Sequence, residues 1–171
     1  MRTRSSMLPA LIAAIVGTVT AGAATLLVGL DDSRTSGGAP VAMADTDSFM
    51  EDAVVDLVNE QRVRAGCEPL VVDPRLADAA EKHSRDMAQR GYFAHTTPEG
   101  LTFRDRIRTA GYPNPGTAEN IARGQRNAEQ VMKSWMASDG HRANIVNCEF
   151  SRVGVGLHGN GMYWTQDFGK V

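Results

Sequence analysis

The feature that most constrains this 171-residue chain is a long uncharged apolar run near its beginning. The run Met7–Leu30 follows Arg2 and Arg4 and ends before Asp31 and Asp32. As a helix its 24 residues would measure about 36 Å, enough to cross the core of a bilayer. A run without a polar face is not typical of a helix in a small soluble core. The pattern therefore indicates an export segment, which leaves about 125 residues for a folded domain.

Two interpretations of the export segment stay open. The string Ala42-Met43-Ala44 is typical of a signal-peptide cleavage site after Ala44, whereas the length of the run favours an uncleaved signal anchor. Both place the domain outside the cytoplasm, because basic residues at the beginning favour a cytoplasmic N-terminus. We expect residues 1–44 to be a signal peptide or anchor plus linker, with the flexible linker itself over 31–48, and residues 45–171 to form the domain. The protein is then secreted, or meets the membrane only through its N-terminal segment.

Charge and cysteine content exclude several functional classes. The chain has 18 Lys and Arg against 20 Asp and Glu, a net charge of -2, so phosphate neutralisation and nucleic-acid binding are not expected. Two cysteines are too few for a zinc site of four thiolates or a disulfide-dense scaffold. In an oxidising compartment we predict a disulfide between Cys67 and Cys148, worth about 4.5 kcal/mol by loop closure; two free thiols are the alternative.

Apolar periodicity predicts helices through most of the domain. Three of the four predicted helices have a capping residue at the start, and the first three end at a glycine. One helix is expected after Asp47 or Ser48, with Phe49, Ala53, Val54, Leu57 and Val58 on its inward face and Gly66 at its end. The other three are expected from Asp73-Pro74 to Gly91, near Thr102–Ala110 before Gly111, and near Ala128–Ser138 behind Asn127.

The last segment changes to a period of two. Alternating apolar residues on both sides of Gly159-Asn160-Gly161 predict a β-hairpin, with Val153, Val155 and Leu157 in one strand and Met162, Trp164, Gln166 and Phe168 in the other. Helices followed by antiparallel strands indicate an α+β domain with helices packed on a small antiparallel sheet.

The common catalytic motifs are absent from the sequence: it has no Gly-x-Ser-x-Gly, His-Glu-x-x-His, Gly-x-x-x-x-Gly-Lys or Gly-x-Gly-x-x-Gly. Instead, five short strings occur in a characteristic order: Tyr92-Phe93-Ala94-His95-Thr96, Ala118-Glu119-Asn120-Ile121-Ala122, Ser134-Trp135-Met136, Gly140-His141-Arg142-Ala143-Asn144-Ile145 and Tyr163-Trp164-Thr165-Gln166-Asp167-Phe168-Gly169. Together they resemble the CAP superfamily of cysteine-rich secretory, antigen 5 and pathogenesis-related 1 proteins, also called the SCP domain. The secreted bacterial branch is most similar, over about residues 50–170. The resemblance implies a three-layer α-β-α sandwich with a broad cleft.

The resemblance also implies a set of cleft residues. The eukaryotic family has two histidines and two acidic residues there, which can bind a divalent metal. His95, Glu119 and His141 match three of these positions. The second glutamate falls on Ser138, and the adjacent Asp139 is a candidate substitute.

The chemistry of these residues leaves several roles open. His95, Glu119 and His141 could bind Zn²⁺ with an open fourth position, or Glu119 could act as a general base through water. They could instead form a polar network that orders the cleft loops without metal. Gln166 could line the cleft or satisfy backbone groups of the hairpin. His83, on the apolar face of its helix, is expected to be a hydrogen-bonded core histidine, with a cleft position as the alternative.

Three functional hypotheses follow. We favour a monomeric, non-enzymatic extracellular binding module, which the resemblance suggests takes an apolar lipid- or sterol-like ligand or a cell-envelope partner. It would require no cofactor. The second is a metal-dependent extracellular hydrolase, peptidase-like, that uses His95, Glu119 and His141. The third is a structural envelope protein with a vestigial cleft.

Overall fold

The computed structural model describes residues 42–113 and 115–171. The predicted export segment therefore lies almost entirely outside the described residues. No helix in the described part of the chain is both long enough and apolar enough to cross a membrane. The elements follow one another as α1 (Ala42–Arg64), β1 (Val71–Val72), α2 (Pro74–Arg90), α3 (Phe103–Thr109), β2 (Thr117–Arg123), α4 (Ala128–Met136), α5 (Asp139–Ile145), β3 (Arg152–His158) and β4 (Tyr163–Gly169).

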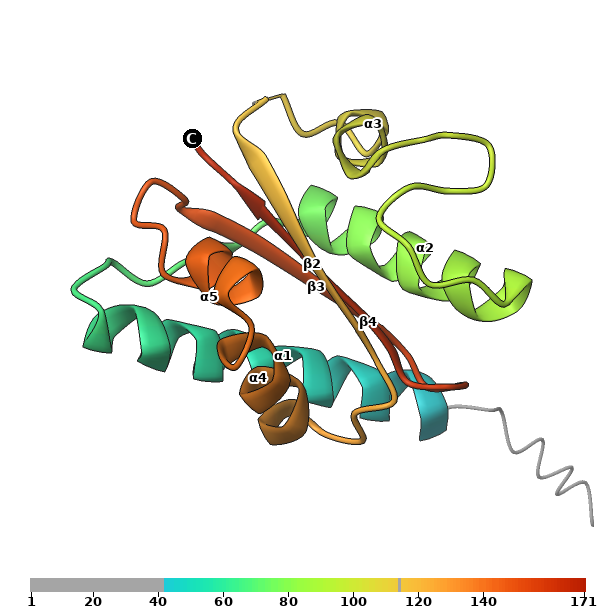
Figure 1. Cartoon of the computed structure of the whole chain (residues 1–171), viewed down its shortest axis with the longest axis horizontal. Helices are drawn as coiled ribbons and strands as arrows, with labels where there is room; N and C mark the ends of the chain where they lie inside the picture. The colour runs from blue at the N-terminus through green and yellow to red at the C-terminus, as the bar shows by residue number, and fades with distance from the viewer. Residues whose placement is uncertain (1–41, 114) are drawn as a thin grey trace, which may run out of the picture. The chain divides into compact units, whose positions relative to one another are not determined.

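The helices cover both faces of one four-stranded sheet with the order β1-β3-β4-β2 (Figure 1). On one face α2 packs against β3 and β4, and α3 lies beside it; α1, α4 and α5 contact the sheet on the other face. This arrangement confirms the predicted α-β-α sandwich. The sheet is antiparallel except where the two-residue β1 pairs in parallel with β3.

The predicted hairpin is confirmed and forms the centre of the sheet. Val155 pairs with Gln166, and Leu157 pairs with Trp164. The side chains on this face join one apolar core with α1, α4 and α5, and the residues of this core include Val54, Val58, Trp135, Ile145, Val153, Val155, Leu157, Trp164 and Phe168. Their common burial is the main driving force for this half of the sandwich.

The opposite face of β3 presents two glycines to α2. A Cβ atom on Gly154 would lie 2.1 Å from the backbone nitrogen of Ala77, and one on Gly156 would lie 2.1 Å from that of Glu81. Only glycine permits the helix backbone to approach a strand this closely. The glycines therefore set the distance between α2 and the sheet.

The predicted caps of α2 and α4 are confirmed. Asp73 Oδ1 accepts a hydrogen bond of 3.0 Å from the Arg75 backbone amide at the start of α2. Gly91 ends that helix with a φ of 70°, which is the left-handed region that favours glycine. Thr102 caps α3 with a capping box, and Asn127 caps α4. Such caps can be predicted from the sequence because the capping residue and the amide that it binds lie within one helical turn.

The predicted beginning of the first helix is wrong. The helix α1 already includes Ala42, so the proposed cleavage position after Ala44 falls in its first turn, and the end of the predicted linker 31–48 is helical. Neither Asp47 nor Ser48 caps it; the Asp47 carboxylate accepts instead from the Gly159 amide at 3.2 Å. The sequence contains no glycine or proline from residue 41 to residue 65 that would interrupt a helix.

Phe49 was expected on the inward face of this helix but is 75% exposed. Its neighbour Met50 packs against the core in its place. Met50 lies one helical turn before Val54, which itself lies one turn before the buried Val58, so these three residues share the inward face and Phe49 falls outside it.

Three elements have no counterpart in the sequence prediction. The strand β2 mixes polar and apolar residues on both faces, so it shows no clean alternation. The helix α5 has seven residues and β1 has two, too few for a periodic pattern. Tertiary packing rather than local preference determines all three elements.

The predicted disulfide between Cys67 and Cys148 is present and joins the end of α1 to the segment after α5. A buried arginine strengthens the same junction. Arg62 is fully buried and donates to the carbonyl oxygens of Ile145 at 2.8 Å, Asn147 at 2.9 Å and Phe150 at 2.8 Å. The junction thus combines a covalent bond with charge-assisted hydrogen bonds.

Candidate functional site

The candidate site is built around Glu119 on the edge strand β2. Glu119 pairs with Asp167 on β4, which in turn pairs with Gly154 on β3. Paired residues point to the same face of a sheet, so both carboxyl groups point toward α2. The Glu119 side chain is completely buried.

Both oxygens of Glu119 are engaged by positively polarised donors. Oε1 lies 2.7 Å from Nδ1 of His95, and Oε2 accepts from Nη2 of Arg106 at 2.5 Å. The Arg106 side chain is 10% exposed, whereas that of His95 is 49% exposed. The carboxylate therefore orients one imidazole at the surface and is itself shielded from solvent.

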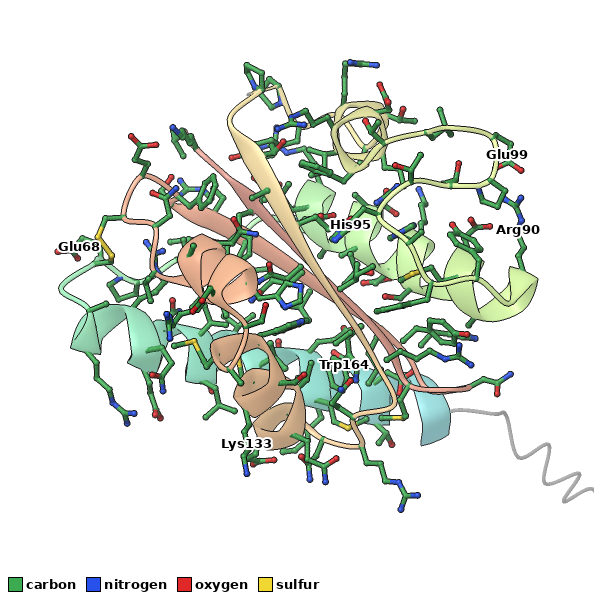
Figure 2. All side chains as sticks on the ribbon, in the orientation of Figure 1. Glu68, Arg90, His95, Glu99, Lys133 and Trp164 are labelled. Carbon is green, nitrogen blue, oxygen red and sulfur yellow. A yellow bond between two sulfur atoms is a disulfide. The ribbon has the colours of Figure 1, made fainter. Side chains whose placement is uncertain are left out.

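The loop between α2 and α3 holds His95 in place (Figure 2). Arg106 Nη1 donates to the carbonyl oxygens of His95 at 3.0 Å and Leu101 at 3.2 Å. On the outer side of this loop, Arg90 Nη1 donates to Glu99 Oε2 at 2.9 Å. One arginine thus fixes both the backbone of the loop and the carboxylate below it, which preorganises the site.

His83 supports the same loop from α2. It is 1% exposed, and its Nε2 lies 3.0 Å from the carbonyl oxygen of Ala94. A carbonyl only accepts, so Nε2 carries a proton. Burial lowers the pKa of His83, with the nearby charge of Glu119 acting in the opposite direction. His83 is therefore a core histidine that also positions the residue before His95.

Asp167 is a second carboxyl group in the buried part of the site. Its side chain is fully buried, and neither oxygen accepts from a donor among the described residues. Burial, followed by the charge of neighbouring Glu119, raises the pKa of Asp167 well above its ordinary value. In the protonated form it can donate to Glu119.

His141 approaches from the other side of the edge strand, on α5. It is half-buried, and burial, with a smaller contribution from the charge of His95, lowers its pKa. Asn120 Nδ2 donates to the His141 carbonyl at 3.2 Å, and Asn144 Nδ2 donates to Asn120 Oδ1 at 2.9 Å. The helix α5 is thereby fixed over the edge of β2, with Asn120 turned away from the side of Glu119.

The remaining candidates lie apart from the Glu119 carboxylate. Gln166 is buried on the α5 side of the sheet, where its Oε1 accepts from Asn120 Nδ2 at 3.1 Å. Ser138 occupies the position before α5 and makes no side-chain capping bond. Asp139 is 94% exposed and pairs with Arg142. The second carboxyl group next to Glu119 is thus Asp167 and not Asp139.

These residues do not fit a metal centre. In residues 42–113 and 115–171, no three or more His, Cys, Asp and Glu side chains are grouped so as to hold a metal ion. Glu119 already binds a guanidinium, whose positive charge would oppose a divalent cation at the same oxygens. We therefore derive no chemical step through a metal.

Arg106 and Asp167 are central to the site but were not identified from sequence. Arg106 lies on a short helix whose orientation toward β2 is a tertiary property. Asp167 was noted only as part of a motif; the register of β4 against β2 gives it its role. The sign of this role was that Asp167, an ionisable residue, lies between Gln166 and Phe168 in a strand whose residues are all buried.

The chain belongs to the CAP family. Residues 55–168 match the family described as "CAP: Cysteine-rich secretory protein family". The chain is 40% identical over 121 residues to the uncharacterized protein YkwD of Bacillus subtilis, covering 71% of this chain and 47% of YkwD. It is 32% identical over 120 residues to the uncharacterized membrane protein YlbC of the same organism, covering 70% of this chain and 34% of YlbC. The chain thus spans less than half the length of these relatives.

Solved structures agree with this assignment. An extracellular protein containing a SCP domain from Bacillus anthracis has a TM-score of 0.74 and 31% identity, over 78% of this chain and 44% of that chain. A cysteine-rich secretory protein from Staphylococcus aureus has a TM-score of 0.62 and 22% identity, over 75% of this chain and 40% of that chain, and supports the fold alone.

Proposed function

We propose that this CAP domain is a non-enzymatic extracellular binding module that recognises an amphipathic ligand, or a cell-envelope partner with the same chemistry, beside His95. The observation that carries the proposal is the engagement of Glu119: His95 and Arg106 occupy both oxygens and the side chain is buried. A carboxylate in this state is better suited to hold an imidazole in one orientation than to take a proton from water.

The surface around His95 supports an apolar contact. Phe93 is 47% exposed and Leu101 is 51% exposed, both on the loop that carries His95. Leu101 also lines a cavity of about 140 Å³, together with Ala79, Ala110 and the polar residues Arg106, Asp78 and Lys82. A cavity of this size accepts a short apolar group, such as the end of an acyl chain, while the polar residues of its lining contact a head group.

The extracellular location is also part of the proposal. The predicted export segment, the disulfide and the extracellular relative from Bacillus anthracis support it. Mass spectrometry of the exported protein distinguishes a released domain from one attached through residues 1–44: a chain that begins at Asp45 is the cleaved form.

The proposal is tested with a fluorescent medium-chain fatty acid as the probe. We expect Leu101→Ser to weaken binding about tenfold, because it removes apolar contact from the cavity rim. Val63→Ser is the matched control, since Val63 is 60% exposed on α1 and does not line this cavity. Absence of binding to the unaltered protein, or equal losses in both variants, would contradict the proposal.

A hydrolase is the second candidate, because the Glu119 carboxylate holds the half-exposed imidazole of His95 at 2.7 Å, an arrangement that suits a general base. This candidate expects turnover of a peptide substrate library that His95→Gln and His141→Gln both abolish. Binding of the fatty acid without turnover supports the first proposal.

A further inference from the structure

A separate polar cavity lies where β3 begins and β4 ends. It has a volume of about 460 Å³, and its lining includes three basic residues, Arg75, Arg152 and Lys170, and three with apolar rings, Tyr112, Pro113 and Pro115. This volume is typical of a small-molecule site. Neither His95 nor Glu119 lines it, so it is distinct from the candidate site.

A smaller cavity continues from the same loop. It has a volume of about 140 Å³, shares Tyr112, Pro113 and Pro115 with the larger one, and adds Arg104 and Arg108 to the lining. Five basic side chains therefore surround the loop between α3 and β2, which lies beside the end of β4 (Figure 1). Such a concentration of cations raises the local concentration of anions.

Three of the five cations already have carboxylate partners. Arg75 pairs with Asp73, Arg108 with Asp105, and Lys170 with Glu149. Asp73 is the acidic side chain in the lining of the larger cavity, and both its oxygens accept from Arg75. It is therefore neutralised and does not repel an incoming anion strongly.

Arg152 and Arg104 differ from the others. Of the residues that the structure describes, no carboxylate lies within 4.0 Å of either guanidinium. Arg152 is half-buried and donates through Nη1 to the Ser151 carbonyl at 3.0 Å, while Arg104 lies over the ring of Phe103. A guanidinium has five N–H donors in a planar fork, so both retain donors for an oxyanion.

The apolar wall of the cavity is formed by Tyr112, Pro113 and Pro115. Tyr112 is 4% exposed, its hydroxyl donates to the Lys170 carbonyl at 2.6 Å, and the Arg75 guanidinium lies 5.1 Å from its ring centre. Pro113 and Pro115 have fixed φ angles and no amide donor. A wall of this kind is preformed and contacts a flat apolar group at little entropic cost.

We propose that the cavity between Arg152 and the Tyr112–Pro115 loop is a second binding site, which takes an organic phosphate: a phosphate group bound by Arg152 with an apolar body against the prolines. The planar fork of arginine matches the oxygen geometry of a phosphate bidentately. The prolines favour an organic phosphate over the inorganic ion, and the cavity has room for a small organic body such as an aromatic ring.

The test uses phenyl phosphate as the probe and the full chain, with isothermal titration at an ionic strength of about 0.15 M, where distant surface charges are screened. Phenyl phosphate is expected to bind more tightly than inorganic phosphate, and phenol is expected not to bind. We expect Arg152→Gln to weaken binding about ten- to a hundredfold and Arg152→Lys to weaken it less, because lysine keeps the charge but loses the fork.

Arg123→Gln is the matched control. Arg123, like Arg152, is an arginine without a carboxylate partner among the described residues, but it is exposed, lies over the ring of Tyr163 and lines neither cavity. Circular dichroism checks that each variant is folded, and Arg152→Lys provides the test if Arg152→Gln is not. Equal losses in Arg123→Gln and Arg152→Gln would overturn the proposal, as would binding of a long polyphosphate alone, since both outcomes indicate unspecific charge attraction.

Discussion

The two faces of the sheet are built on different principles. On the face of α1, α4 and α5, large apolar side chains such as Trp135, Trp164 and Phe168 fill the space between layers. On the face of α2, glycines at 154 and 156 bring the helix backbone onto the strand. One face is therefore filled by large apolar side chains, whereas on the other the α2 backbone lies directly on β3 and the apolar clusters, such as that of Leu76 and Ile107, are smaller.

The difference determines where ionisable groups can be buried. The α2 face holds Glu119, Asp167 and His83, all 5% exposed or less, in a small volume next to Arg106. Several of their polar atoms, among them Nδ1 of His83 and both oxygens of Asp167, have no partner among the described residues. Buried polar atoms without partners cost free energy. The large apolar core on the face of α1, α4 and α5 offsets this cost.

The largest effect should come from adding one methyl group between α2 and the sheet. Gly156→Ala is expected to lower the free energy of unfolding by about 4 kcal/mol, above the usual range for overpacking, because the obstacle is backbone rather than a mobile side chain. Urea unfolding measures it. Gly140→Ala is the control, since nothing lies within 4 Å of a Cβ there; similar losses in both variants would show that the glycines do not set the spacing.

The second-largest loss of stability is expected from removing the guanidinium of Arg106, which pairs with Glu119 on the α2 face. We expect Arg106→Ala to lower the free energy of unfolding by about 3 kcal/mol, because it leaves the buried Glu119 without its ion-pair partner. Arg108→Ala is the matched control on the same helix, where the Arg108 side chain is 75% exposed and its pair with Asp105 is weak. Arg106→Ala should also change the NMR shifts of His95. An unchanged stability would mean that Glu119 is protonated or hydrated.

Much of the fold could be predicted from sequence, but less of the site. Helix caps such as Asp73 and Asn127 and the hairpin are local patterns, so they were readable. Of the site, motif resemblance identified His95 and Glu119, which lie 2.7 Å apart. Arg106 and Asp167 could not be assigned, because their positions depend on the orientation of α3 and on the register between β2 and β4.

A pH effect should appear where α1 meets the end of β3. Burial, partly offset by a hydrogen bond from the Leu157 amide, raises the pKa of Glu51 to about 7. The folded state then binds this proton more tightly than the unfolded state, so the contribution of Glu51 to stability is fully present below about pH 4.5 and is lost as pH rises to about 7.

Glu51→Gln should remove that fall and stabilise the protein at pH above about 7 by roughly 2 kcal/mol; we discount the full shift because Glu51 is partly exposed. Glutamine keeps an acceptor for Leu157. Thermal unfolding between pH 5 and pH 8 checks this, with Asp52→Asn as the exposed control. Parallel pH profiles for Glu51→Gln and the unaltered protein would contradict the assignment of Glu51.

The smallest change in stability is expected from substitution of Asp139. This substitution also tests whether the second carboxyl group of the site lies on the α2 face or on α5. Asp139→Ala should change the free energy of unfolding by less than about 0.5 kcal/mol, because the side chain is 94% exposed and only pairs with Arg142. It should also leave the NMR shifts of His95 unchanged. Asp167→Asn, by contrast, should move those shifts through Glu119, since Asp167 is the carboxyl group that faces it across the strands. If Asp139→Ala moved the His95 shifts and Asp167→Asn did not, the second carboxyl group of the site would belong to α5 rather than to the α2 face.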